Sequence, residues 1–322
     1  MFRLGHQLPR IQGDRRAGDQ VQPALALAGD PPRARDRRSG GRARDRGRVM
    51  EVRRLDDRTA EPSPRAVGRL VRRDGTGAPA AWRVPEETPL AVLVNGANFA
   101  VMMATPADFE DFAVGFAVTE GLAPDAGAID GLRVAESRDG YVLNLRVPER
   151  LAAKAEERRR TLAGRAGCGV CGAQTIEAAL PPPRRVRGAA PAVEALARAL
   201  DAFPDAQPMR AVNRSTHAAA FCASDGTIRL VREDVGRHNA LDKLAGALLR
   251  ERTDAGDGFI LMSSRISVEL VQKACAIGAP CLAAVGAPTA LALRLAASAG
   301  LTLAAAAPGG VMIFDGTELE GR

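Results

Sequence analysis

The clearest pattern in the sequence is an alternation of short apolar runs and longer amphipathic segments over the last hundred residues. The short apolar runs predict strands at 227–232, 259–262, 280–285 and 301–306. Between them, apolar residues recur at helical spacing and predict helices at 239–250, 267–277 and 288–299. Strands that alternate with helices in this way usually join a largely parallel sheet covered on both faces. The pattern therefore predicts an α/β domain with a mostly parallel sheet, which we place at residues 186–322.

Residues 63–160 show a different pattern, in which strands follow one another directly. The apolar run 90–94 ends in Asn95-Gly96, a strong turn signal, and 99–103 can return as its hairpin partner. Two further short strands are expected between residues 133 and 147. This part of the chain is predicted to be a smaller α+β domain.

Two helices are expected in the same domain. Thr105 as N-cap, Pro106 at the first position and Asp108 completing a capping box predict a helix that starts at residue 106 and ends before Gly121. A second, charged helix is expected over 149–165. It leads into a glycine-rich segment with two cysteines, so residues 161–185 are predicted to be a mobile loop.

The N-terminal 62 residues lack a sustained hydrophobic period and are expected to be a disordered tail. Residues 1–50 hold twelve arginines against five aspartates, a surplus that accounts for the whole formal charge of +7. The rest of the chain is balanced, so the charge gives no reason to expect a nucleic-acid partner. An alternative is that translation begins at Met50 and the first 49 residues are not part of the natural protein.

The compartment is predicted from the cysteines and from hydropathy. No run of about 18 apolar residues is present, so no membrane association is expected. Five cysteines at irregular spacing do not match the disulfide framework of a small secreted domain. We therefore expect a cytoplasmic protein.

Polar residues and glycines gather in the loops that follow the predicted strands. Because the carboxyl ends of parallel strands share one edge of a sheet, these loops are expected to form a ligand site. Two or three of them also open helices, whose free N–H groups suit phosphate or pyrophosphate. The loops are 233–238, 263–265, 286–289 and 308–310.

Three side chains in these loops and one nearby histidine are candidate binding residues. His238 and Arg237 stand with Glu233 and Asp234 in a dense polar cluster. Arg265 follows Ser263 and Ser264 and is a candidate anion contact, with a capping or ion-pair role as the alternative. His217, taken alone, would more often be a core histidine than a catalytic one, and its interest comes from the residues around it.

The segment Cys168-Gly-Val-Cys171 could be half of a zinc site, a redox pair or a carrier thiol. Zinc needs four ligands, and no second close Cys/His pair stands elsewhere in the chain, so no metal site is predicted. A following helix and Arg165 would favour the thiolate, which could accept a sulfur atom from a donor persulfide. Cys222, Cys275 and Cys281 lie in apolar patterns and are interpreted as buried packing residues.

The motifs together resemble the formate dehydrogenase accessory sulfurtransferase family (FdhD). The resemblance rests on strings that occur in the family's order from about residue 65 to 314. These include Arg232-Glu-Asp-Val-Gly-Arg-His-Asn-Ala-Leu-Asp-Lys-Leu244, Ser263-Ser-Arg-Ile-Ser-Val-Glu-Leu-Val-Gln-Lys273, Cys168-Gly-Val-Cys171-Gly172 and Ala287-Pro288-Thr289.

The resemblance implies a fold and an activity. It implies a cytidine-deaminase-like fold for the C-terminal half and a persulfide on Cys168, with Cys171 assisting or resolving. Sulfur would come from a cysteine desulfurase and pass to the molybdenum bis(molybdopterin guanine dinucleotide) cofactor, bound as substrate, of formate dehydrogenase. A homodimer is the expected assembly. Cofactor contacts would come from Ser263, Ser264, Arg265, His217, Arg237, His238 and the segment Ala306, Ala307, Pro308, Gly309, Gly310 and Val311.

The sequence departs from the family pattern in that last segment. The aromatic residue and arginines expected there are replaced by Ala306-Ala-Pro-Gly-Gly-Val311, which leaves backbone amides as the contacts. Two other functions stay open: a chaperone that holds the cofactor without moving sulfur, and a zinc-dependent deaminase. The deaminase signature of His-x-Glu with Pro-Cys-x-x-Cys is absent from the sequence.

Overall fold

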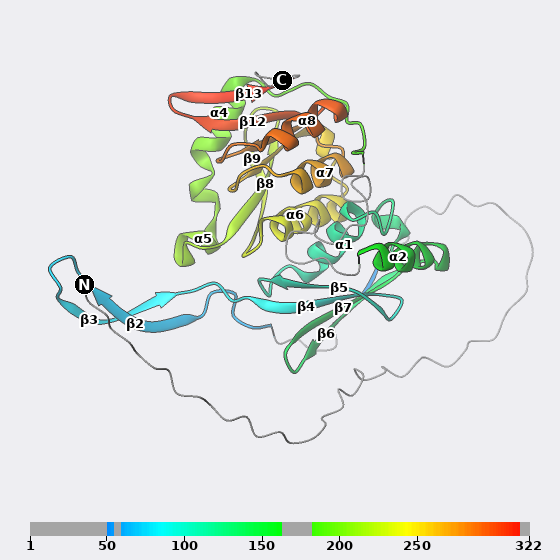
Figure 1. Ribbon diagram of the computed structural model, residues 1–322, viewed down its shortest axis with the longest axis horizontal. Coiled ribbons are helices and arrows are strands. Elements are labelled where there is room, and N and C mark those ends of the chain that lie inside the picture. The colour runs from blue at the N-terminus through cyan, green and yellow to red at the C-terminus, as the bar shows by residue number, and fades with distance from the viewer. Residues whose placement is uncertain (1–49, 55–58, 163–181, 316–322) are drawn as a thin grey trace, which may run out of the picture. The chain divides into compact units, whose positions relative to one another are not determined.

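The N-terminal half of the computed structural model is built on a five-stranded mixed sheet (Figure 1). The model describes residues 50–54, 59–162 and 182–315. The strand order is β1-β6-β7-β4-β5, and the strands are β1 (Glu51–Arg54), β4 (Thr88–Val94), β5 (Ala97–Ala104), β6 (Gly131–Ser137) and β7 (Gly140–Arg146). β1 pairs with β6, and β4 with β7, in parallel, and the two hairpins β4–β5 and β6–β7 are antiparallel.

The predicted hairpin at Asn95-Gly96 is confirmed. Asn95 (φ 48°) and Gly96 (φ 87°) both take positive φ, as a two-residue hairpin turn requires. β1 lies inside the segment predicted to be a tail, so the tail does not extend to residue 62. The reason is that Glu51–Arg54 pairs with β6 through backbone groups, a contact that the hydropathy of those residues does not reveal.

Two helices, α1 (Phe109–Thr119) and α2 (Glu149–Leu162), pack beside this sheet, with the short 3-10 helix η1 (Ala126–Ala128) between them in sequence. The predicted start of α1 at residue 106 is wrong. Asp108 takes a left-handed conformation (φ 54°), and the helix begins only after it. The hydroxyl of Thr105 accepts the N–H of Val235, 3.0 Å away, and does not cap α1. The Thr105 side chain is thus used in a contact with the other half of the chain.

The C-terminal half is built on a six-stranded sheet in the order β13-β12-β11-β10-β8-β9. Its strands are β8 (His217–Ala223), β9 (Ile228–Asp234), β10 (Gly258–Met262), β11 (Cys281–Ala284), β12 (Thr302–Ala307) and β13 (Gly310–Phe314). Only the β10–β11 and β11–β12 pairs are parallel, while β8–β9, β8–β10 and β12–β13 are antiparallel. The prediction of a mostly parallel sheet was therefore wrong, because β8 runs antiparallel to both β9 and β10, and β13 runs antiparallel to β12.

Helices cover both faces of this sheet, as expected. α6 (Arg237–Glu251), α7 (Val268–Ala276) and α8 (Ala290–Ala299) share one apolar cluster on the first face. α4 (Val193–Ala202) packs on the second face through Leu196, Ala199 and Phe203. The remaining short elements are α5 (Pro208–Asn213) and the 3-10 helices η2 (Pro204–Ala206) and η3 (Ala255–Asp257).

The two sheets are joined by the packing of α1 on α6. The backbones meet at two glycines: a Cβ on Gly115 would lie 1.8 Å from the carbonyl oxygen of Asp242, and one on Gly246 would lie 1.8 Å from that of Asp111. Only glycine allows helices to approach so closely. A buried amine strengthens the contact, because Lys273 Nζ lies 2.8 Å from Asp242 Oδ1 and 2.9 Å from Glu120 Oε1.

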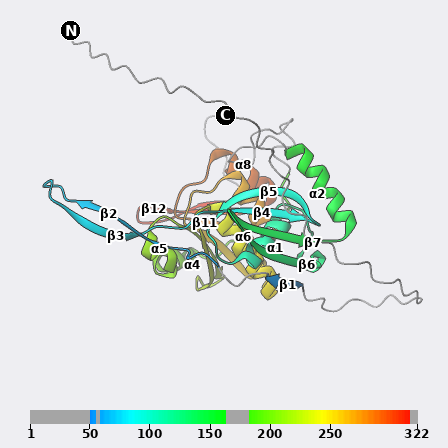
Figure 2. The ribbon, with the colours of Figure 1, turned by 90° about the horizontal axis from the view of Figure 1, so that it is seen from below.

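A separate two-stranded ribbon is formed by β2 (Arg65–Val71) and β3 (Gly77–Arg83). It lies apart from both sheets in two perpendicular views (Figures 1 and 2). Its base is held by α5, since Asn213 Nδ2 donates to Ser63 Oγ at 3.1 Å. None of the helices in the described ranges is long and apolar enough to cross a bilayer.

Candidate functional site

The candidate site is the edge of the C-terminal sheet where four strands end. β9, β10, β11 and β12 run in one direction, while β8 and β13 run in the other. The carboxyl ends of the first four therefore share an edge with the starts of β8 and β13. This topology brings every candidate binding residue to that edge: His217, Arg237, His238, Ser263, Ser264, Arg265 and the segment 306–311.

Backbone and hydroxyl contacts fix the loop after β10 to the start of β8. The N–H of Ala218 donates to Ser263 Oγ at 2.8 Å, and the N–H of Ser263 donates to the carbonyl of Ala218 at 3.0 Å. Ser263 Oγ also lies 3.4 Å from His217 Nδ1. Ser264 is buried, and its hydroxyl donates to the carbonyl of Arg265 at 2.9 Å. Ser263 and Ser264 therefore hold His217 and Arg265 in place.

Positive charge accumulates at this edge. Burial lowers the pKa of His217, and the nearby charges of Arg237, Arg210, His238 and Arg265 lower it further. The pKa of Arg237 is also lowered, by burial and by repulsion from Arg265. Positive charges gathered in this way favour a bound anion, which would relieve the repulsion. We call these five side chains, His217, Arg210, Arg237, His238 and Arg265, the cationic cluster.

Two donor atoms of the cationic cluster lack a hydrogen-bond partner among the described residues. They are Arg237 Nε and His238 Nε2, and both are buried. The nearest carboxylate oxygen to His238 is Glu269 Oε2 on α7, at an ion-pair distance of 3.8 Å. His238 lowers the pKa of Glu269 to about 2. A buried donor without a partner is costly, so the cluster is suited to an incoming acceptor such as a phosphate oxygen.

Glu233 and Asp234 do not join the cationic cluster, contrary to the polar cluster expected from the sequence. The Glu233 carboxylate accepts the N–H groups of Met209 and Arg210, each at 2.7 Å, and so fixes α5. Because α5 carries Arg210, these contacts of Glu233 position Arg210 in the cationic cluster.

Asp234 anchors the other half of the chain. Its Oδ2 lies 2.7 Å from Lys243 Nζ and 2.9 Å from the N–H of Thr105, while its Oδ1 accepts from the N–H of Gly236 at 2.8 Å. Asn239 Nδ2 lies 3.0 Å from the same oxygen. Asp234 thus orders the residues on either side of Arg237 and His238 and ties them to the β5–α1 loop.

The segment 306–311 forms a hairpin at the edge. Ala306 pairs with Val311 and Ala307 with Gly310, and Pro308 and Gly309 make the turn. Gly309 takes φ 78° and has no neighbouring atom where a Cβ would lie. The turn is exposed, so its backbone is available to a ligand.

The two candidate catalytic cysteines, Cys168 and Cys171, lie outside the described residues, as do most of the predicted loop 161–185 and the helix expected after it. The three other cysteines, Cys222, Cys275 and Cys281, are buried, and burial raises the pKa of each to about 12. Their interpretation as packing residues agrees with this burial.

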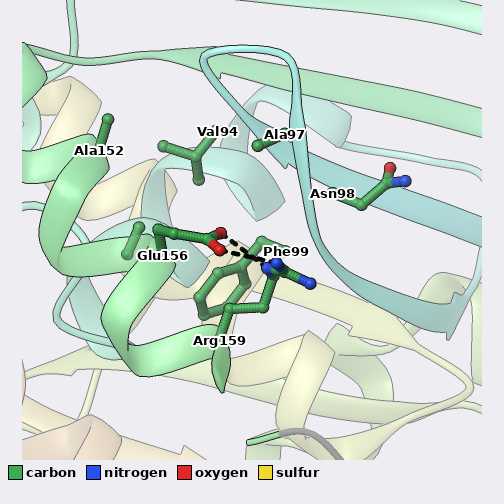
Figure 3. Close-up of a pocket in the computed structure, with 8 residues that line it drawn as sticks. Val94, Ala97, Asn98, Phe99, Ala152, Glu156 and Arg159 are labelled. Carbon is green, nitrogen blue, oxygen red and sulfur yellow. Dashed lines mark hydrogen bonds and ion pairs between the residues drawn. The ribbon is translucent and has the colours of Figure 1, made fainter. Parts of the chain in front are cut away.

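A small pocket lies elsewhere, between the β4–β5 turn and α2 (Figure 3). Val94 and Phe99 line it, and Arg159 Nε donates to Glu156 Oε2 at 2.8 Å at its side. Its free volume is about 20 Å³, enough for one water molecule and far too small for a nucleotide. Within the described ranges, no three His, Cys, Asp or Glu side chains are placed to hold a metal ion.

Two residues of the site were missed in the sequence. Arg210 stands on α5, seven residues before His217, and nothing in its local pattern marks it. Glu269 stands in the first turn of α7, in the same motif as Arg265, and nothing in the local pattern marks it as part of the site.

The fold and the site define an α/β protein with a cluster of positive side chains at one sheet edge. The model of the FdhD/NarQ family matches residues 85–318. The chain therefore belongs to the FdhD/NarQ family.

Named relatives agree with this assignment. The chain is 49% identical to the "Sulfur carrier protein FdhD" of Xanthomonas euvesicatoria pv. vesicatoria over 224 residues, which cover 69% of this chain and 80% of the relative. The protein of the same name from Bordetella petrii is 45% identical over 203 residues, or 63% of this chain and 73% of the relative. A crystal structure from Desulfotalea psychrophila, assigned as a formate dehydrogenase accessory protein, has a TM-score of 0.61 at 22% identity. It covers 79% of this chain and 97% of its own, and it supports the fold.

Proposed function

We propose that this protein is a sulfur carrier that receives sulfane sulfur as a persulfide on Cys168 and passes it to molybdenum bis(molybdopterin guanine dinucleotide). That cofactor is the substrate, and its sulfuration would serve formate dehydrogenase activity. The proposal draws on membership in the FdhD/NarQ family and on the names of its relatives.

One observation carries the ligand half of the proposal. The cationic cluster places three arginines and two histidines around one sheet edge, where Arg237 Nε has no hydrogen-bond partner among the described residues and His238 Nε2 has only the ion pair with Glu269 at 3.8 Å. A guanine dinucleotide presents pyrophosphate oxygens, each an acceptor that suits such donors. The exposed 308–310 turn would add backbone N–H groups. Affinity should therefore come mainly from the phosphates, because residues 306–311 offer no polar side chain.

The sulfur half of the proposal is thiol chemistry. The thiolate of Cys168 attacks the outer sulfur of a donor persulfide; a new S–S bond forms, the donor's S–S bond breaks, and the donor leaves as a thiolate. Release then needs two electrons to turn sulfane sulfur into sulfide. Attack of Cys171 on the inner sulfur of the Cys168 persulfide supplies them, because it forms a Cys168–Cys171 disulfide and expels hydrosulfide. A thiol reductant resets the pair.

Mass spectrometry after incubation with a cysteine desulfurase and cysteine tests the sulfur half. The Cys168 peptide should gain one sulfur atom, and Cys168→Ala should abolish the gain. The matched control is Cys222→Ala, which removes a buried thiol and should leave the label unchanged. With Cys171→Ala, the persulfide should accumulate while sulfide release falls. Equal label on wild type and Cys168→Ala would instead favour a chaperone that binds the cofactor without moving sulfur.

Calorimetric titration with guanosine diphosphate tests the ligand half. Arg237→Gln should weaken binding about tenfold, the usual loss for one charge-assisted contact. The control is Arg229→Gln, an exposed arginine on β9 that is not part of the cationic cluster. Equal affinity in the two variants would contradict the site.

The remaining expectations belong to the same proposal. A cysteine desulfurase as donor, formate dehydrogenase as beneficiary and a cytoplasmic location fit a carrier whose thiol must stay reduced. The cytidine-deaminase-like fold for residues 186–322 is proposed on the same footing.

A further inference from the structure

Glu269 brings a negative charge to the cationic cluster. It stands in the first turn of α7, and its Oε2 lies 3.8 Å from His238 Nε2. Burial and Arg265 lower the pKa of Arg237, and the charge of Glu269 partly offsets both effects. Glu269 therefore acts on the two side chains, His238 and Arg237, whose buried donors suit a phosphate oxygen.

The Glu269 carboxylate is ionised at neutral pH. The contact with His238 contributes most to lowering its pKa to about 2, although burial opposes this change. Ser267 and the backbone N–H of Glu269 lower the pKa further. A carboxylate at the start of a helix and beside cationic donors occupies the kind of position that a phosphate would take. The free protein thus holds an anion of its own in the cationic cluster.

The same two helices are fixed to each other by a tighter pair one turn further along. Asp242 follows His238 by four positions on α6, and Lys273 follows Glu269 by four positions on α7. Lys273 Nζ lies 2.8 Å from Asp242 Oδ1 and 3.0 Å from Asp242 Oδ2, and both side chains are buried. Because this buried pair holds α7 against α6, the contact between Glu269 and His238 can open by rotation of side chains alone.

The contact between Glu269 and His238 is also weak enough to open. The two side chains are 25% and 24% exposed, so both can reach water when they separate. An ion pair at this distance and exposure contributes little. A pyrophosphate brings more negative charge and more acceptor oxygens than one carboxylate, so it can displace Glu269 from the cationic donors.

We propose that the Glu269 carboxylate competes with a ligand phosphate for His238 and Arg237, and that it turns away from them when the phosphate binds. The proposal rests on the proposed function, because it takes the cationic cluster as the phosphate site. It adds a selective role for Glu269. A ligand with one weak acceptor cannot offset the lost contact, whereas a ligand with several phosphate oxygens can.

Calorimetric titration of the full chain with guanosine diphosphate and with inorganic pyrophosphate tests the competition. Glu269→Gln keeps the size of the side chain and removes its charge, and it should bind both ligands about tenfold more tightly than wild type. The matched control is Glu194→Gln, which removes an exposed carboxylate from the first turn of α4 and should leave both affinities unchanged. If Glu269 merely supported the site, its loss would weaken binding.

Thermal melting at pH 7 gives a second test. Without ligand, Glu269→Gln should melt below wild type, because it lacks the contact with His238. With saturating pyrophosphate the difference should shrink or reverse, because the contact is then open in both proteins and the variant binds more tightly. An unchanged difference would show that Glu269 keeps its contact in the complex, which would overturn the proposal.

The titrations separate the failure of this competition from the failure of the phosphate site itself. If wild type binds both ligands and Glu269→Gln binds them equally or more weakly, the competition is refuted and the phosphate site stands. If Glu269→Gln loses affinity for guanosine diphosphate alone, Glu269 contacts the guanine base, and the competition is again refuted. If neither protein binds either ligand, the phosphate site is refuted together with the competition.

Discussion

The ion pair between Asp234 and Lys243 lies within the C-terminal half, and it is expected to stabilise the contact with the N-terminal half because both side chains also bind the backbone of Thr105. Both side chains are fully buried, and their charged atoms lie 2.7 Å apart. In Lys243→Met, Asp234 would keep its N–H donors but lose its counter-charge. Breaking a buried pair in this way costs about 3–5 kcal/mol of unfolding free energy.

The double variant Asp234→Asn with Lys243→Met removes both charges. The new amide oxygen can still accept one of the N–H groups now bound to Asp234, so we expect the double variant to lose about 2 kcal/mol less than the sum of the single variants. Guanidinium chloride unfolding followed by circular dichroism measures these differences. The comparison requires that the unfolding free energies of all variants fall with denaturant concentration at the same slope. Arg229→Met is the control for removing an exposed charge. A loss below about 1 kcal/mol in Lys243→Met, or additive single losses, would refute the reasoning.

Three further predictions concern the site and the helix contact. The pKa of His217 is lowered in the free protein, and an anion bound at the cationic cluster should raise it. Guanosine diphosphate should therefore bind more tightly at pH 6 than at pH 8, as measured by calorimetry. His217→Asn should remove most of this difference; an unchanged pH dependence would exclude His217 as its source. Gly246→Ala should lower the unfolding free energy by about 3 kcal/mol or more, because the added Cβ would lie 1.8 Å from the backbone of Asp111. The control is Gly68→Ala, where a Cβ meets no atom and thermal melting should change little. Folding lowers the pKa of Glu269 from 4.5 to about 2, so its stabilising contact with His238 should be present above pH 4.5 and lost towards pH 2. The melting temperatures of wild type and Glu269→Gln should therefore differ most above pH 4.5 and converge in acid. A constant difference across that range would count against the contact.

Local signals predicted most of the individual elements. The Asn95-Gly96 turn predicted its hairpin because both residues tolerate positive φ. Apolar periodicity placed α6, α7 and α8 within two residues at each end. These elements satisfy their own backbone hydrogen bonds, and their sequences carry the information needed to form them.

Partners far away in the chain decided the points that were predicted wrongly. Thr105 has the sequence of a helix cap, but its hydroxyl accepts from Val235, 130 positions later. β8 pairs antiparallel with β9 and β10, and β13 pairs antiparallel with β12, so the sheet is mixed although the alternating pattern favoured parallel strands. Strand direction depends on which neighbour a strand finds, and hydropathy does not encode that choice.

The sequence by itself determined the family, the elements and the positions of the candidate binding residues, because each rests on a local motif or period. Only the tertiary structure decided what those residues do. Glu233 and Asp234 stand beside Arg237 and His238 in the chain, yet they point into structural contacts, while Arg210 and Glu269 join the site from other elements. The electrostatic potential at a site sums the contributions of all nearby charges. It can therefore be worked out only when the strands and helices that carry those charges are placed at one edge.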